Sequence, residues 1–135
     1  KLKEMKIDLL VGPAMGGILV AYELGRQLGI EAIFTERVDN IMALRRGFEV
    51  SEGMNIVICE DVVTTGKSSM EVKALLESMG AKVIAIASII DRTNEELELP
   101  LISSLRVEID TFDADDCPLC KQGTPVVKPG SRKMD

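Results

Sequence analysis

Short apolar runs alternate with amphipathic segments along most of this chain. Runs of apolar and β-branched residues predict buried strands at residues 7–11, 32–35, 55–60, 81–90 and 105–109. Apolar residues at helical spacing predict helices over 18–28 and 68–79, and a glycine, Gly29 or Gly80, follows each pattern as a stop signal. After residue 113 the composition shifts to Pro, Gly, Lys and Asp, so we expect an irregular tail.

This alternation of strands and helices predicts an α/β fold. We expect an open, mainly parallel twisted sheet with helices on both faces and right-handed crossovers between its strands. No internal repeat or long linker divides the chain, so one core domain is expected over residues 1–112, followed by a C-terminal tail, 113–135. Ligands bind such sheets beyond the carboxyl ends of the strands. The loops that follow the strands should therefore converge on one edge.

The charge balance of the chain excludes some classes of partner. The 135 residues include 16 basic and 22 acidic side chains, for a net charge of −6, and no basic run occurs. Such a chain is a poor candidate for binding nucleic acid. No apolar stretch reaches the roughly 18–20 residues of a membrane span, and no signal peptide pattern is present. We therefore expect a cytoplasmic protein with neither nucleic acid nor membrane as a partner.

The three cysteines do not suggest a disulfide framework, because their number is odd. Cys117 and Cys120 resemble half of a zinc site, but the chain has no second pair and no histidine. A reduced, non-catalytic pair is the favoured interpretation, and a zinc site completed by carboxylates or by another subunit is the alternative. The chain starts with Lys1 and the first predicted strand follows closely, so we expect that its natural start is missing.

The segment from residue 56 to residue 68 carries the strongest functional signal. An apolar run ends in the carboxylates of Glu60 and Asp61, and a Thr/Thr/Gly turn and a helical pattern follow. A helix N-terminus favours a phosphate, and Gly66 lets the backbone approach it closely. Ionised carboxylates suit ribose hydroxyls or the water shell of a magnesium ion. The pattern therefore predicts a site for a ligand with both a sugar diol and a phosphate.

Three other interpretations of this segment fit less well. Gly66-Lys67-Ser68 matches the end of a Walker A loop, but Asp61 stands where that loop requires its first glycine. No dinucleotide-binding Gly-x-Gly-x-x-Gly pattern occurs. An ordinary loop with a Thr or Ser helix cap explains one hydroxyl. It does not explain an acidic pair, two threonines and a glycine in succession.

The sequence Glu60-Asp61-Val62-Val63-Thr64-Thr65-Gly66-Lys67-Ser68 resembles the phosphoribosyl pyrophosphate motif of type I phosphoribosyltransferases. Its first seven residues are most similar to the orotate phosphoribosyltransferase form, and the resemblance spans nearly the whole chain. It implies a glycosyltransferase (a pentosyltransferase) of the type I fold that makes orotidine 5'-monophosphate in pyrimidine biosynthesis. It also implies phosphoribosyl pyrophosphate and orotate as substrates and a homodimer. Mg²⁺ is the implied cofactor, held through substrate and water with no direct protein ligand. An N-terminal hood segment is expected in that family, and this sequence begins after it.

The resemblance also implies roles for individual residues. Glu60 and Asp61 would be the catalytic pair and hold the ribose hydroxyls, while Thr64 and Arg92 would contact orotate. The loop at Ala14, Met15, Gly16 and Gly17 would bind pyrophosphate, although a tight turn is the favoured explanation when the loop is taken alone. The expected ligands of phosphoribosyl pyrophosphate are Arg37, Glu60, Asp61, Val62, Val63, Thr64, Thr65, Gly66, Lys67 and Ser68.

The chain departs from the family pattern in the long segment 38–54, which we expect to be a lid. Val38 stands where orotate enzymes often carry a lysine, and the chain has no histidine. Arg45, Arg46 and Lys67 are the available charge donors, although Arg45 and Arg46 also suit a solvated hairpin. A purine-type phosphoribosyltransferase and a non-catalytic regulator that binds phosphoribosyl pyrophosphate therefore stay open as alternatives.

Overall fold

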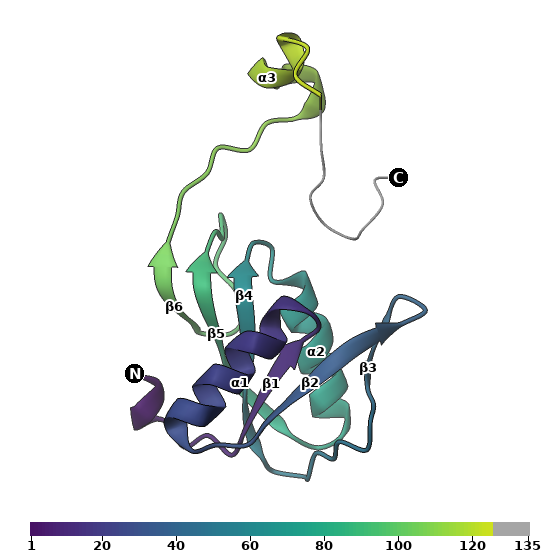
Figure 1. The fold of residues 1–135 in the computed structure, drawn as a ribbon, viewed down its shortest axis with the longest axis vertical. Helices are drawn as coiled ribbons and strands as arrows, with labels where there is room; N and C mark the ends of the chain where they lie inside the picture. The colour runs from purple at the N-terminus through teal and green to yellow at the C-terminus, as the bar shows by residue number, and fades with distance from the viewer. Residues whose placement is uncertain (126–135) are drawn as a thin grey trace.

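A six-stranded sheet forms the centre of the computed structural model, which describes residues 1–125 (Figure 1). Its strand order is β3-β2-β1-β4-β5-β6, and every pairing is parallel except that of β2 with β3. The open, mainly parallel α/β sheet predicted from the sequence is confirmed. The strands are β1 (Leu9–Pro13), β2 (Ala32–Val38), β3 (Ile41–Leu44), β4 (Asn55–Val63), β5 (Lys82–Asp91) and β6 (Leu101–Arg106).

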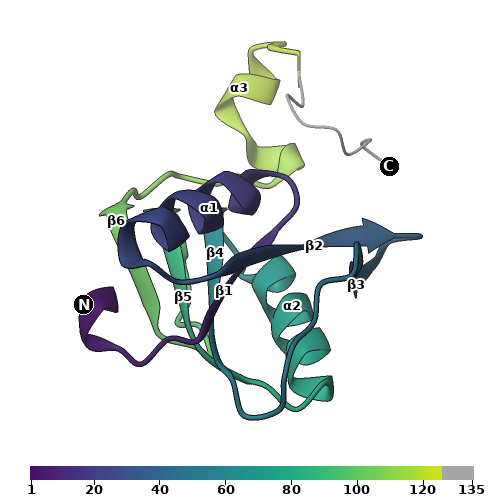
Figure 2. The same cartoon turned by 60° about the horizontal axis from the view of Figure 1, so that its bottom comes forward.

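The two longer helices, α1 (Gly16–Leu28) and α2 (Lys67–Ser78), cover opposite faces of this sheet (Figure 2). Successive residues of a strand point to opposite faces, and β4 accordingly packs against both helices. Its residues Val57 and Cys59 share a core cluster with Ala21 of α1. Residues Ile56 and Ile58 share the other cluster with Val72 and Leu76 of α2. Both faces of β4 are therefore buried, which explains its continuous apolar run.

The predicted strand at 105–109 is wrong in its position, because β6 spans Leu101–Arg106. Leu101 and Ile102 pair with Ile86 and Ala87 of β5, and their side chains are half-buried against the core. Residues 107–113 contain no helix or strand. The apolar residues Ile109 and Phe112 are exposed. A prediction based on hydrophobicity alone therefore placed this strand too close to the C-terminus.

The segment 38–54, expected to be a lid, contains a strand that the sequence analysis did not predict. β2 and β3 form an antiparallel hairpin that extends beyond the rest of the sheet (Figure 2). Its turn residues Asp39 and Asn40 have positive φ angles of 49° and 65°. A two-residue turn with two positive φ angles matches the twist of a hairpin, and Asp and Asn tolerate it. The pair Asp39-Asn40 is the local signal that indicates this hairpin.

Shorter helical turns lie near the two ends of the described chain. They are η1 (Leu2–Glu4), η2 (Ala114–Asp116) and α3 (Pro118–Lys121). The last two differ from the wholly irregular tail expected after residue 113. Residues 128–133, which also resemble orotate enzymes, lie outside the described residues. Within residues 1–125, no helix is long and apolar enough to cross a membrane.

Candidate functional site

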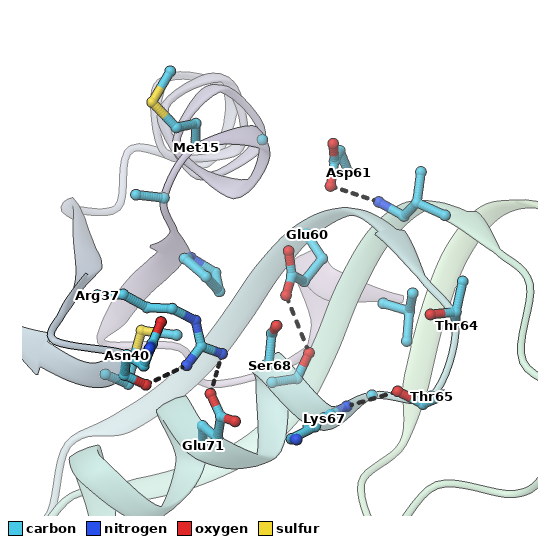
Figure 3. Close-up of a pocket in the computed structure, with 18 residues that line it drawn as sticks. Met15, Arg37, Asn40, Glu60, Asp61, Thr64, Thr65, Lys67, Ser68 and Glu71 are labelled. Carbon is cyan, nitrogen blue, oxygen red and sulfur yellow. Dashed lines mark hydrogen bonds and ion pairs between the residues drawn. The ribbon is translucent and has the colours of Figure 1, made fainter. Parts of the chain in front are cut away.

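A cavity of about 900 Å³ opens at the carboxyl ends of β1, β2 and β4 (Figure 3). The β1–α1 loop, the β2–β3 hairpin, the β4–α2 loop and the first turns of α2 contribute to its wall. The expected convergence of loops on one edge is therefore present for these three strands. The lining comprises residues 13–16, Arg37, Asn40, Met42, residues 60–69 and Glu71.

Most of the predicted site residues meet in this cavity. All of Glu60 through Ser68 line it, together with Arg37 and three members of the small-residue loop, Ala14, Met15 and Gly16. Four predicted residues, Gly17, Arg45, Arg46 and Arg92, are not part of the lining. The lining residues that the sequence analysis missed are Pro13, Asn40, Met42, Ser69 and Glu71.

The β4–α2 loop ends in a helix N-terminus that faces the cavity. Gly66 caps α2 with a positive φ of 70°, a conformation that glycine adopts without strain. A Cβ at this position would also lie 2.9 Å from Cδ2 of Leu97. The first N–H groups of a helix have no partner within it, and here they belong to lining residues. Thr65 Oγ1 accepts the N–H of Lys67 at 3.4 Å. The loop can therefore present backbone donors to an anion.

The two adjacent carboxylates point in different directions (Figure 3). Glu60 is 8% exposed and points toward the start of α2, where its Oε1 accepts the hydroxyl of Ser69 at 3.4 Å. Asp61 is exposed, and its Oδ1 accepts the N–H of Val62 at 2.8 Å. The alternation of side chains along a strand separates neighbouring residues in this way. Two carboxylates are thus available on different sides of the end of β4.

The small-residue loop is explained in large part by close packing. A Cβ at Gly12 would overlap the carbonyl oxygen of Gly17, and one at Gly17 would overlap the carbonyl oxygen of Cys59. At Gly16, a Cβ would overlap the carboxylate of Asp61. The start of α1 therefore lies directly against β1 and β4. This packing needs no ligand, so a pyrophosphate role for the loop stays a prediction.

Acidic side chains slightly outnumber basic ones among the lining residues. Glu60, Asp61 and Glu71 are acidic, whereas Arg37 and Lys67 are basic. Arg37 Nη1 donates to the carbonyl oxygen of Asn40 at 2.8 Å, and its Nη2 forms an ion pair with Glu71. A highly charged anion in this cavity therefore needs positive charge beyond these two side chains.

Arg45 and Arg46 lie beyond the end of β3 and pair with a carboxylate outside the cavity lining. Glu36 lies 3.7 Å from Arg45 Nη1 and 3.2 Å from Arg46 Nη2. The guanidinium of Arg46 also lies 5.8 Å from the centre of the Phe34 ring, within the range of a cation–π contact. In this conformation both arginines share the single negative charge of Glu36.

Arg92 lies just after β5, beside the end of β4. Its backbone N–H donates to the carbonyl oxygen of Val63 at 2.8 Å. Its Nε is enclosed and, among the residues that the structure describes, has no hydrogen-bond partner. A buried donor without a partner is costly, and no hydrogen bond within the described residues offsets that cost for this Nε.

A hydrogen-bond network that sequence reasoning missed surrounds Arg92. The buried Asp91 accepts the backbone N–H and the hydroxyl of Thr93, both at 2.8 Å, and Arg106 Nη1 at 3.4 Å. The bond from the Thr93 N–H is the main cause that lowers the pKa of Asp91 from its ordinary value, and burial opposes it. An Asp that bonds to the backbone two residues later is a familiar turn pattern. The network fixes the backbone on both sides of Arg92.

Of the three cysteines, Cys59 does not resemble a nucleophile in this structure. Burial, followed by the nearby charge of Glu60, raises the pKa of Cys59 to about 12. That thiol is protonated at neutral pH. A backbone hydrogen bond from Cys120 is the main cause that lowers the pKa of Cys117. Within residues 1–125, no group of three or more His, Cys, Asp or Glu side chains could hold a metal ion.

Comparison with known proteins places this geometry in context. A family model described as the phosphoribosyl transferase domain matches residues 1–101. The orotate phosphoribosyltransferase of Caldanaerobacter subterraneus subsp. tengcongensis is 49% identical over 136 residues, which cover 99% of this chain and 72% of that protein.

Solved structures share the fold at lower identity. The adenine phosphoribosyltransferase of Thermoanaerobacter pseudethanolicus matches with a TM-score of 0.67 and 24% identity, over 78% of this chain and 73% of that one. The orotate phosphoribosyltransferase of Mycobacterium tuberculosis matches with a TM-score of 0.65 and 23% identity, over 77% of this chain and 62% of that one. At such identities the similarity shows the fold, which is that of type I phosphoribosyltransferases.

Proposed function

This chain belongs to the phosphoribosyltransferase family, and from that membership we propose that it is an orotate phosphoribosyltransferase. The reaction moves the phosphoribosyl group of phosphoribosyl pyrophosphate to orotate and releases pyrophosphate. The observation that carries this proposal is the orotate enzyme that is 49% identical over 99% of the chain. The cavity supports it, because the whole segment from Glu60 to Ser68 lines one wall.

The ribose 5-phosphate part of the substrate fits the β4–α2 loop. Glu60 and Asp61 accept hydrogen bonds from the ribose hydroxyls, since an ionised carboxylate is an acceptor only. The N–H groups at the start of α2 and the hydroxyls of Thr64, Thr65 and Ser68 hold the 5-phosphate. The pairing of Glu60 with Ser69 at 3.4 Å supports this arrangement, because it orients one carboxylate before the substrate binds.

The pyrophosphate lies between Arg37 and the loop of Ala14, Met15, Gly16 and Gly17. Since acidic side chains outnumber basic ones in the lining, Mg²⁺ is needed beside this polyanion. Oxygen ligands suit this ion, and Glu60 and Asp61 would contact its water shell. Within residues 1–125, no group of three or more metal-ligating side chains occurs, so the substrate and water would hold the ion. When bound, the ion would neutralise charge on the departing pyrophosphate.

The chemistry requires no nucleophilic side chain. The attacked carbon gains cationic character as pyrophosphate leaves, and the residues of the cavity align the reactants and donate hydrogen bonds to the leaving group. The high pKa of Cys59 agrees with this, since its thiol stays protonated. Arg45 and Arg46 supply further charge to the leaving group after they separate from Glu36.

Orotate binds beside the ends of β4 and β5. Its carboxylate pairs with the guanidinium of Arg92, a planar group that suits bidentate contacts. The backbone near Thr64 meets the pyrimidine ring. Support comes from the backbone bond that ties Arg92 to Val63 at the end of β4, next to the Glu60–Ser68 segment. We further propose a homodimer, which the resemblance to orotate enzymes implies, and a cytoplasmic location.

A base-selection assay tests this function. The protein is mixed with phosphoribosyl pyrophosphate, Mg²⁺ and one base (orotate, adenine, guanine or xanthine), and pyrophosphate release is measured. We expect release with orotate alone. Release with a purine base instead supports a purine-type enzyme. Tight binding of phosphoribosyl pyrophosphate without release with any base supports a binding regulator.

A further inference from the structure

Glu71 is an acidic side chain in the cavity that lies outside the Glu60–Ser68 motif. It belongs to α2 and forms an ion pair with Arg37 of β2, 34 positions away in the sequence (Figure 3). The two side chains are similarly enclosed, with 29% of Arg37 and 31% of Glu71 exposed. The pair connects the β2–β3 hairpin to the helix whose N-terminus faces the cavity.

Two contacts fix the orientation of the Arg37 guanidinium. Nη1 donates to the carbonyl oxygen of Asn40 at 2.8 Å, and Nη2 pairs with Glu71. A guanidinium has several further N–H donors, so both contacts leave part of the group available to a ligand. A long arginine side chain loses much rotamer freedom when it is ordered. Here that loss is incurred before the ligand arrives.

We propose that Glu71 is a positioning residue that holds Arg37 toward the pyrophosphate of the substrate. This inference rests on the proposed function, in which Arg37 contacts pyrophosphate. Glu71 acts through Arg37 and need not touch the substrate itself. Its negative charge opposes an anion that binds close by, so a net benefit requires the gain from fixing Arg37 to exceed this repulsion. The proposal therefore predicts that removal of Glu71 weakens the affinity for pyrophosphate.

The test measures the affinity for inorganic pyrophosphate and for phosphoribosyl pyrophosphate, each with Mg²⁺, by titration calorimetry. The variants are Glu71→Ala, Glu71→Gln, Arg37→Ala and the double variant Arg37→Ala/Glu71→Ala. We expect Glu71→Ala to weaken both affinities about tenfold, the size typical of coupling between contacting charged residues. In the Arg37→Ala background, loss of Glu71 should not weaken the affinity further and should raise it slightly, because Glu71 then has nothing to position and only its repulsion of the anion is removed.

Glu77→Ala is the matched control. Glu77 lies on the same helix and pairs with Lys73 at 2.9 Å, and it is not part of the cavity lining. Its removal takes away the same charge and should leave both affinities unchanged. Glu71→Gln keeps the side-chain volume, and a thermal melt of each variant confirms that the fold is intact.

Three results would overturn the proposal. One is an affinity for pyrophosphate that rises when Glu71 is removed, which makes Glu71 a competitor of the substrate. The second is an affinity that does not change. The third is a loss of affinity in the double variant that equals the losses in Glu71→Ala and Arg37→Ala taken together. These affinities are measured without turnover. A protein that does not use orotate as a substrate but still shows the coupling between Glu71 and Arg37 would contradict the proposed function and leave the role of Glu71 intact.

Discussion

The carboxylate of Asp61 lies against the backbone of Gly16, so closely that a Cβ added at Gly16 would overlap it. Asp61 lies in the last part of β4, and Gly16 is the first residue of α1. The contact therefore joins the acidic pair to the loop that we expect to bind pyrophosphate. Any side chain at Gly16 must move Asp61 or the start of α1.

Gly16→Ala should lower turnover about tenfold or more, because the added methyl group displaces the Asp61 carboxylate from its position. In an ordinary helix, alanine is more favourable than glycine by about 1 kcal/mol. Here the overlap should cancel this gain in the free energy of unfolding. The double variant Gly16→Ala/Asp61→Ala should recover it, since the overlapping group is gone. Steady-state kinetics and denaturant unfolding measure both effects, and wild-type turnover in Gly16→Ala would contradict the predicted displacement.

Asp61→Asn should reduce turnover by about two orders of magnitude or more while the fold stays intact. The substitution keeps the shape of the side chain and removes the charge that we place beside the ribose hydroxyls and Mg²⁺. Because Asp61 is exposed, the free energy of unfolding should change by only about 0.5 kcal/mol. Initial rates with orotate and a thermal melt test the prediction. Unchanged turnover would reject the role of Asp61.

Arg92→Lys should raise the KM for orotate about tenfold and leave the KM for phosphoribosyl pyrophosphate unchanged. Lysine keeps the positive charge but lacks the planar fork that binds a carboxylate with two parallel hydrogen bonds. Initial rates at varied concentrations of each substrate separate the two constants. Arg26→Lys is the control, because Arg26 pairs with Glu23 on the exposed side of α1. An equal rise in both constants would argue against a contact specific to orotate.

Asp91→Asn should lower the free energy of unfolding at neutral pH by about 1–2 kcal/mol, because a charged acceptor of several hydrogen bonds is lost. The pKa of Asp91 in the folded protein lies below its ordinary value of 3.8. Its contribution is therefore fully present above about pH 4, and it is lost as the pH falls through the folded-state pKa. Urea unfolding between pH 7 and pH 3 should show the two proteins converging. A difference that does not depend on pH would contradict this assignment.

Helices and strands could be predicted from the sequence where one face or both faces of the element are buried. The expected helix 18–28 lies within α1, and the expected strand 55–60 lies within β4. β3 was missed because its four residues are too few for a clear pattern, and only the turn at Asp39 and Asn40 indicates it. β6 was misplaced because Leu101 is adjacent to Pro100 and two serines interrupt the apolar run.

The candidate site could be predicted in part. The segment from Glu60 to Ser68 lines the cavity as a unit, because consecutive residues around one strand end stay together in any fold that keeps that strand and helix. Glu71 was missed, since a single Glu within a helix resembles any solvated position. Arg45 and Arg46 were grouped with the charge donors, but both pair with Glu36 in this structure.

The sequence by itself determined the chemical groups and the strand–acid pair–helix order that orients them, because these lie within a few consecutive residues. Only the tertiary structure decided the contacts across elements, such as Arg37 with Glu71, Asp91 with Arg106 and Gly16 with Asp61. These pairs are separated by 15 to 45 positions in the sequence. Their proximity depends on the crossovers and on the register of the parallel strands, which no local pattern of residues specifies.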